Sequence, residues 1–254
     1  PIDLTPCLTP EKKHNLVVKE TANLQDGTIP PGNQTSFLHS YKCSYTRTTG
    51  IWQTVWMEAA APQALEEVKM ACDIDAKQLT IIPRFHSVTT NMQFFCKVLS
   101  AESTQVASYH GNAKEGAPIT LAIPSMELWA PENPHLYSIQ FNVLVDGVVQ
   151  DTVFSYMGMR QVEIRGNQVY LNHKKIYQRL VLDQGYYPQS QWTSPDDDSL
   201  KQDILLAKTA GFNGARLHQK VFEPRYLYWA DVFGYLCWGE SPSWGLEYNG
   251  EGLP

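Results

Sequence analysis

The pattern of residues 174–239 constrains the fold of this 254-residue chain more than any other feature. Strand-like apolar runs alternate there with two helix-like runs, which we predict over residues 195–211 and 223–234. Each helix has a recognisable start, an Asp-rich first turn in one and Pro224 in the other, and a glycine follows each last turn. This alternation predicts parallel strands joined by crossover helices.

The three strand-like runs cover residues 174–183, 212–218 and 235–239, and no GxGxxG motif follows any of them. The lack of that motif disfavours a dinucleotide-binding sheet. For residues 160–254 we therefore predict the first three β/α units of a TIM barrel. In such barrels the functional groups lie at the C-terminal ends of the strands.

Polar side chains follow all three strand-like runs at those ends. They are Asp183 and Gln184 after the first, Arg216, His218 and Gln219 after the second, and Glu240 after the third, with Trp244 just beyond. Hydrogen-bonding groups, a cation and an aromatic platform are what a sugar site needs. We expect these side chains on one rim, with Asp183, Arg216 and Glu240 close together on one side of the sheet.

Plain structural interpretations exist for the same residues. Arg216 fits an ordinary ion pair with Glu240. His218 fits a satisfied histidine at the rim, and Trp244 fits core packing. A metal-dependent hydrolase using His218, Asp183 and Glu240 is a weaker alternative, because the chain has no HxH or HExxH spacing. We expect neither a metal nor a cofactor.

Upstream, the sequence favours β-structure in two further zones. Residues 63–159 contain strand-like runs at 66–75, 78–87, 92–100, 119–124, 137–147 and 148–158. About seven short strands over roughly a hundred residues is typical of an immunoglobulin-like sandwich. The Asp146-Gly147 pair predicts a tight hairpin. In residues 1–62 the runs at 15–20 and 50–58 predict strands of another sandwich.

Composition excludes several classes of protein. The net charge is −6 and the 20 Lys and Arg residues are scattered, which argues against a nucleic-acid partner. No apolar run approaches the ~20 residues that span a bilayer. The five Cys are an odd number without CxxC spacing, so we expect reduced, mostly buried thiols. The cytoplasm is the expected compartment, and export stays open because the chain begins with Pro1.

Three groups of motifs resemble glycoside hydrolase family 2, which includes β-galactosidases, β-glucuronidases and β-mannosidases. Residues 45–58, YTRTTGIWQTVWME, are similar to the strand that ends the family's jelly-roll sugar-binding domain. Residues 128–137, LWAPENPHLY, resemble its immunoglobulin-like middle domain. Residues 180–188 and 211–244 resemble the first three strands of its catalytic barrel.

The resemblance implies three domains, at residues 1–62, 63–159 and 160–254, and a β-glycoside as substrate. It also implies roles at the rim: Arg216 would orient the catalytic carboxylates and Glu240 would line the sugar pocket. His218 and Gln219 fall where many members have a Ser-His pair, so which of them takes the histidine's role stays open. Asp183 and Gln184 replace the usual polar pair, which suggests a distinct sugar preference.

Members of the family are retaining glycosidases with two catalytic carboxylic acids. The family's acid/base lies in an Asn-Glu pair after strand four and its nucleophile after strand seven. No Asn-Glu pair occurs in this chain. We therefore expect an internal piece of a larger glycosidase that is inactive alone, with no catalytic residue of its own. We also expect it to self-associate through the open barrel edge. A non-catalytic carbohydrate-binding or scaffolding module is the alternative.

Overall fold

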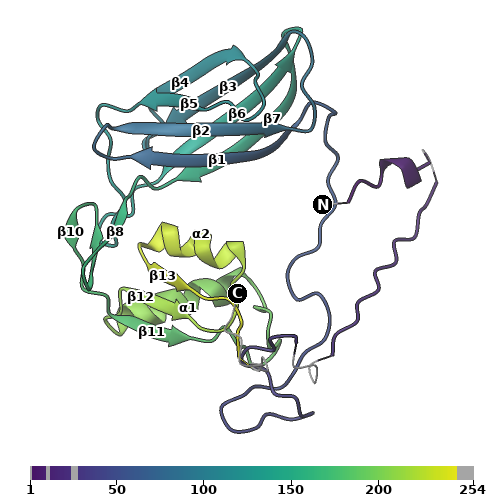
Figure 1. Ribbon diagram of the computed structural model, residues 1–254, viewed down its shortest axis with the longest axis vertical. Coiled ribbons are helices and arrows are strands. Elements are labelled where there is room, and N and C mark those ends of the chain that lie inside the picture. The colour runs from purple at the N-terminus through teal and green to yellow at the C-terminus, as the bar shows by residue number, and fades with distance from the viewer. Residues whose placement is uncertain (1, 10–11, 24–27, 245–254) are drawn as a thin grey trace.

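A computed structural model describes residues 2–9, 12–23 and 28–244. The described chain is mainly β and forms an extended N-terminal segment (the described residues before Leu65), a two-sheet sandwich and a smaller α/β unit (Figure 1). The mainly β structure expected from the sequence is present, together with a smaller part in which helices and strands alternate. Among the described residues, neither helix is long or apolar enough to cross a membrane.

The N-terminal segment contains a short 3-10 helix, Thr5–Cys7, and isolated bridges such as Gln34 with Tyr45, but no strand within its described residues. The strands predicted at residues 15–20 and 50–58, and with them a jelly-roll sheet, are wrong for this structure. A β-strand is stable only when its backbone N–H and C=O groups pair with a neighbour. These runs have no such neighbour here, and Val17 and Trp56 are largely exposed.

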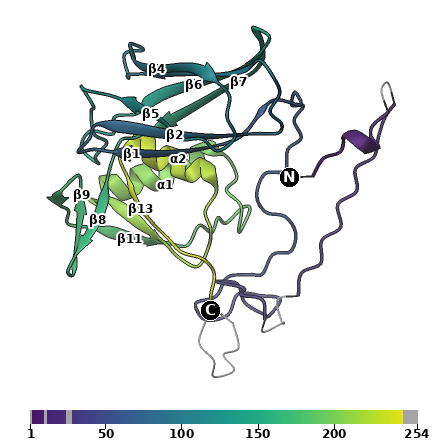
Figure 2. The same cartoon turned by 45° about the horizontal axis from the view of Figure 1, so that its top comes forward.

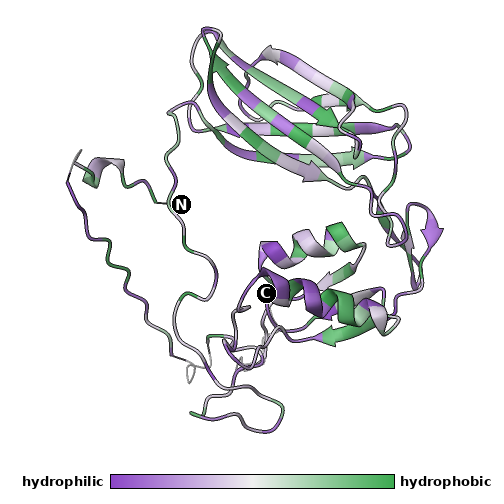
Figure 3. Cartoon of the chain, turned by 180° about the vertical axis from the view of Figure 1, so that it is seen from behind, coloured by the Kyte–Doolittle hydropathy of each residue, from purple (hydrophilic) through white to green (hydrophobic). Residues whose placement is uncertain are grey.

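The sandwich is built from seven antiparallel strands in two sheets, ordered β1-β2-β5 and β4-β3-β6-β7 (Figure 1). The strands are β1 (Leu65–Asp73), β2 (Gln78–Phe85), β3 (Met92–Leu99), β4 (Gln105–Asn112), β5 (Ile119–Ala122), β6 (Tyr137–Val145) and β7 (Val148–Met157). Hydropathy alternates along several of them (Figure 3). Inward side chains such as Leu79, Phe94 and Phe141 form one core between the sheets.

The local sequence predicts most strands of the sandwich but does not predict β4. The hairpin between β6 and β7 turns at Asp146 and Gly147, whose φ angles of 50° and 78° are left-handed, as the Asp-Gly pair predicts. Strand β4 was not among the predicted runs. Its sequence, QVASYHGN, has few β-branched residues, and β4 is held by antiparallel pairing with β3 instead.

Cysteine burial differs from the expectation. Cys96 is buried in the sandwich core, and burial raises the pKa of its thiol to about 12. Cys7, Cys43 and Cys237 are exposed, however, so the prediction of mostly buried thiols is wrong. All five are free. Two of the exposed thiols lie in the N-terminal segment, which has no core of its own to bury them.

A small antiparallel sheet follows the sandwich, with β8 (Val162–Arg165), β9 (Gln168–Leu171) and β10 (Lys174–Lys175). His173, between β9 and β10, ties this sheet to the sandwich. Its Nε2 lies 2.8 Å from Asp75 Oδ1 in the β1–β2 turn, and its Nδ1 lies 2.6 Å from Glu163 Oε1 on β8. The hydrogen bonds to Asp75 and Glu163 raise the pKa of His173 above its ordinary value.

This contact predicts a pH-dependent stability. Because the pKa of His173 is raised in the folded state, its stabilising effect is fully present below the unfolded value of ~6.5 and is lost as pH rises through the folded pKa. His173→Asn keeps a residue that tolerates the local φ of 63°. Thermal unfolding of both proteins between pH 5.5 and 8.5 should show Tm values that converge at high pH. Parallel curves would contradict the prediction.

The α/β unit has three parallel strands in sequence order, β11 (Leu180–Asp183), β12 (Gly214–Leu217) and β13 (Leu236–Gly239). Helices α1 (Asp197–Thr209) and α2 (Pro224–Phe233) connect them. Asp196 caps α1 by accepting the Ser199 N–H, as the Asp-rich start predicts. Both helices contribute to one buried cluster with Val181, Ala215 and Leu217, so they cover the same face of the sheet (Figure 2).

Asp231 on α2 joins the α/β unit to the sandwich. Its carboxylate lies 2.9 Å from an Arg160 guanidinium nitrogen and accepts a hydrogen bond from the Tyr156 hydroxyl at 3.2 Å. Its backbone carbonyl accepts the indole N–H of the buried Trp129 at 2.8 Å. The Arg160 guanidinium also stacks over the Trp129 ring. These contacts hold α2 against the sandwich and leave the opposite face of the sheet uncovered.

Candidate sugar-binding rim

Arg216 and Glu240 meet at the C-terminal ends of β12 and β13. The Arg216 Nε donates to Glu240 Oε1, and the backbone N–H of Gln219 donates to Glu240 Oε2 at 3.2 Å. Burial alone would raise the pKa of the Glu240 carboxyl, but these partners hold its pKa below the usual range. Glu240 is therefore an ionised carboxylate at neutral pH, suited to binding rather than to proton donation.

Gln219 fixes the turn that follows β12. Its φ of 56° lies in the left-handed region, which is uncommon for a residue other than glycine. The side-chain oxygen of Gln219 accepts the backbone N–H groups of Ser243 and Trp244, both at 2.8 Å. This side chain thus links the turn after β12 to the segment after β13, and it positions Trp244 at the rim.

His218 lies beside Trp244 and has an unusual environment. Its side chain is only 4% exposed, and the two rings meet edge to face with centroids 4.7 Å apart. Burial lowers the pKa of His218, although Glu240 opposes the shift. The ring is therefore neutral at neutral pH, and Nδ1 has no hydrogen-bond partner among the described residues. The interpretation of His218 as a histidine whose hydrogen-bonding atoms all have partners is therefore wrong for Nδ1. Trp244 is 43% exposed, so it is not a core residue.

Asp183 lies apart from this group, contrary to the expectation of one shared side. Leu182 pairs with Arg216, and Arg216 pairs with Trp238, so these three side chains share the open face of the sheet. Asp183 comes one residue after Leu182 and pairs with Leu217, so it lies on the other face. Its carboxylate accepts the Tyr226 hydroxyl of α2 at 3.1 Å and the Gly185 N–H at 2.8 Å. Because side chains alternate between the faces of a strand, Asp183 points to the helices.

Gln184, the other predicted residue after β11, is half-buried. No hydrogen bond of its side chain occurs within the described residues. The structure therefore brings together Arg216, His218, Gln219, Glu240 and Trp244, and it leaves Asp183 and Gln184 outside that group. Asp183 therefore does not join Arg216 and Glu240 on one side of the sheet, contrary to the prediction from the sequence.

The N-terminal segment also reaches the rim, which the sequence did not predict. Asn33 is fully buried, and its side-chain amide donates to the carbonyl of His218 at 3.2 Å. Gly32, with a φ of 63°, passes so close that a Cβ there would lie 2.5 Å from the Gln219 carbonyl oxygen. Only a residue without a side chain fits that approach. The Pro-Pro-Gly-Asn stretch, residues 30–33, was the signal that could have indicated it.

Lys220, in the turn after β12, also contacts the N-terminal segment. The side chain is 1% exposed, and its ammonium donates to the carbonyls of Gly185 at 2.8 Å and Trp192 at 2.6 Å. It also lies over the ring of Trp52, 4.7 Å from the centroid. Burial lowers the pKa of Lys220. One buried cation therefore connects the N-terminal segment, the loop after β11 and the turn after β12.

The open face of the sheet forms a shallow hollow of about 570 Å³ lined by Leu180, Leu182, Arg216 and Trp238. Leu182 and Trp238 are half exposed. Arg216 stands at the end of this apolar surface, beside Glu240. Among residues 2–9, 12–23 and 28–244, no three His, Cys, Asp or Glu side chains gather as metal ligands. The arrangement can bind a polar ligand next to an apolar surface, and it contains no second carboxylate beside Glu240.

Comparison with known proteins identifies the class. Residues 53–160 match the sequence profile described as Glycosyl hydrolases family 2. A β-galactosidase of Staphylococcus xylosus is 24% identical over 200 residues, which are 77% of this chain and 19% of that protein. A β-glucuronidase of Streptococcus agalactiae is 27% identical over 134 residues, 51% of this chain and 21% of that protein.

Solved structures share the fold. A β-glucuronidase of Ruminococcus gnavus in complex with C6-substituted uronic isofagomine gives a TM-score of 0.62 at 20% identity, covering 71% of this chain and 30% of that chain. A glycosyl hydrolase family 2 member of Bacteroides cellulosilyticus gives a TM-score of 0.66 at 20% identity. The match covers 77% of this chain and 27% of that chain.

These matches show that the chain is similar to glycoside hydrolases of family 2, and the resemblance predicted from the motifs is confirmed. The chain spans 13–33% of the length of the curated relatives compared with it.

Proposed function

We propose that this chain forms part of a retaining glycoside hydrolase that acts on β-glycosides, and that Arg216, His218, Gln219, Glu240 and Trp244 bind the sugar. The observation that carries the proposal is the ion pair of Arg216 with Glu240 at the ends of two parallel strands, beside a neutral histidine and an exposed indole. Such a site offers a cation, hydrogen-bonding groups and an aromatic surface to a pyranose ring.

We also propose that the α/β unit is the beginning of a TIM barrel and that the sandwich is an immunoglobulin-like domain. Helices on one face of the β11–β13 sheet, with an apolar opposite face, suit the first units of a TIM barrel, whose interior is filled by side chains of its strands. A doubly wound sheet would carry helices on both faces. The seven-stranded sandwich suits an immunoglobulin-like domain. We also propose domain boundaries near residues 62 and 159 and a cytoplasmic location.

The proposal assigns the acid/base and the nucleophile to other parts of the parent protein. A retaining mechanism needs two carboxyl groups about 5–5.5 Å apart, one of them protonated. Glu240 is ionised and occupied by Arg216 and the Gln219 N–H. Asp183 faces the helices and is occupied by Tyr226. Neither is placed to protonate a glycosidic oxygen, so Glu240 serves to orient Arg216 and the sugar.

Activity assays of the parent protein test this function. The complete reading frame should hydrolyse nitrophenyl β-glycosides, and the 254-residue chain at equal concentration should not. In the parent, Arg216→Lys should lower kcat/KM by roughly 100-fold, because lysine cannot reproduce the planar guanidinium contact. Arg84→Lys, on the sandwich surface, is the matched control. Robust turnover by the chain alone, or an inactive parent, would overturn the proposal.

The open sheet face leads to a further prediction, that the isolated chain self-associates. An uncovered three-stranded sheet with Leu182 and Trp238 half exposed offers an edge and an apolar face to a second copy. Light scattering should show a mass that rises with concentration, and Trp238→Glu should reduce it. Val148→Glu, at an exposed sandwich hairpin, should not. A concentration-independent monomer would contradict this prediction.

A further inference from the structure

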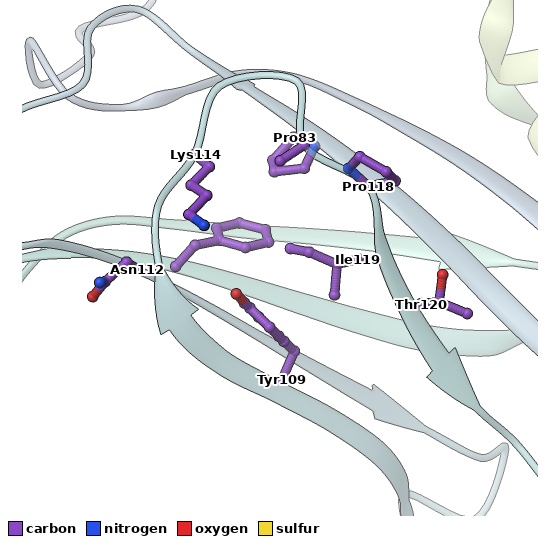
Figure 4. Close-up of a pocket in the computed structure, with 9 residues that line it drawn as sticks. Pro83, Tyr109, Asn112, Lys114, Pro118, Ile119 and Thr120 are labelled. Carbon is purple, nitrogen blue, oxygen red and sulfur yellow. The ribbon is translucent and has the colours of Figure 1, made fainter.

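A second cavity opens in the sandwich, at the side where β4 and β5 face each other (Figure 4). Its volume is about 440 Å³, within the range of small-molecule sites. The cavity exists because β5 is short. Its pairing with β2 ends at Ile119 with Ile81, so Pro83 on β2 lies beyond the paired segment. The connection from β4 to β5 arches over this gap instead of filling it.

The walls of the cavity combine an apolar floor with polar groups at its mouth. Phe94, fully buried, and Pro83 and Ile119 provide apolar surface. The phenol of Tyr109 leans along β4 over Gly111, where a Cβ would lie 2.4 Å from the tyrosine oxygen. A glycine at this position is therefore required for the tyrosine to take this direction and to line the cavity.

Two polar groups point into this space without a partner. Figure 4 shows the side chains of Lys114 and Tyr109 reaching into the cavity from different sides. Within the described chain, neither the Lys114 ammonium nor the Tyr109 hydroxyl makes a hydrogen bond or an ion pair. The neighbouring acid does not neutralise the lysine, because Glu115 contacts Arg84 at 3.4 Å and accepts the Phe85 N–H at 2.9 Å.

The charge of the lining selects the ligand. The residues around the cavity include one cation, Lys114, and no carboxylate. One ammonium balances one negative charge, and a charge-assisted hydrogen bond to a carboxylate is stronger than one to a neutral oxygen. The Tyr109 hydroxyl and the Asn112 amide suit sugar hydroxyls, and Pro118 and Ile119 suit the apolar C–H face of a ring.

From this combination we propose that the cavity between β2, β4 and β5 is a binding site for a monosaccharide unit that carries a carboxylate, that is, a uronic acid. The site belongs to the sandwich and includes none of the rim residues. It would hold an acidic unit of a saccharide independently of the reaction assigned to the parent protein.

Amide chemical shifts of the isolated chain test the site, since no activity is needed. Titration with sodium D-glucuronate should shift the amides of Tyr109, Lys114 and Ile119. D-Glucose and sodium acetate should bind at least about ten-fold more weakly, because each lacks either the charge or the ring. Lys114→Gln should weaken glucuronate binding by about ten-fold or more. Lys114→Arg keeps the charge and should retain binding.

Lys69→Gln provides the matched control, since it removes the same charge from an exposed position on β1. It should bind glucuronate like the unchanged chain, and Tyr109→Phe should bind it more weakly. Equal binding of glucose and glucuronate would overturn the role of the carboxylate. Equal binding of acetate and glucuronate would overturn the role of the sugar ring. Shifts confined to Arg216 and its neighbours would overturn this site while leaving the proposed function intact.

Discussion

Replacing Phe94 by alanine should lower the free energy of unfolding of the sandwich by about 3–5 kcal/mol, a large part of the stability of one domain. Phe94 is fully buried between the two sheets. Its ring stacks on Phe141 with centroids 5.7 Å apart and meets Phe85 edge to face at 5.6 Å. The substitution removes the buried apolar area and leaves a space that the paired strands cannot close.

Phe154→Ala is the matched control for this prediction. Phe154 lies on β7, outside the core and 75% exposed, so the same truncation should change the free energy by no more than about 0.5 kcal/mol. Urea unfolding followed by near-ultraviolet circular dichroism would measure both. Equal stability of the two variants would show that the core between the sheets does not hold the sandwich together. Phe94→Ala should also enlarge the cavity beside Lys114 and weaken any ligand held there.

How far the sequence predicts this structure depends on where each element finds its partners. Helices α1 and α2 carry their own signals, the Asp196 cap and the glycine stop at Gly234, and both were predicted within a few residues. Strands β6 and β7 alternate clearly and are joined by a two-residue turn with a known sequence preference. Such elements are encoded by residues close together in the chain.

Elements defined by distant residues were predicted less well. The Gly50–Glu58 run has the composition of a strand, yet it has no pairing partner in this structure, so propensity alone misleads. Strand β4 is the opposite case, since its pairing with β3 outweighs its weak propensity.

The candidate site shows the same limit. Proximity of Arg216 to Glu240 followed correctly from the ends of adjacent parallel strands. The side on which Asp183 lies depends on the strand register, which sequence spacing did not fix, and a single residue decides the face. The contribution of Gly32 and Asn33 depends on a return of the N-terminal segment across nearly two hundred residues. The Pro-Pro-Gly-Asn stretch predicts a turn there, but it does not indicate which distant residues the turn contacts. The similarity to family 2 does not depend on Asp183, because the match lies at residues 53–160.

The connection between the N-terminal segment and the rim should depend strongly on Lys220. Lys220→Met keeps an unbranched apolar stem but removes the ammonium, so the buried carbonyls of Gly185 and Trp192 lose their donor. Each unsatisfied buried carbonyl costs about 1–3 kcal/mol. We expect a comparable loss in the free energy of unfolding of the α/β unit. The loss of the cation over the Trp52 ring should also release the N-terminal segment.

Hydrogen exchange of the backbone amides would localise this effect. In Lys220→Met, protection should fall in the turn after β12 and around Trp52, while the sandwich amides of β3 and β6 keep their protection. Lys69→Met, at an exposed position on β1, should leave both regions unchanged. If the rim and the N-terminal segment stayed as protected in Lys220→Met as in the unchanged chain, Lys220 would not be the connection between them. Asn33 and Gly32 would then have to hold the segment against the His218–Gln219 turn by themselves, and Asn33→Ala would become the substitution with the larger effect.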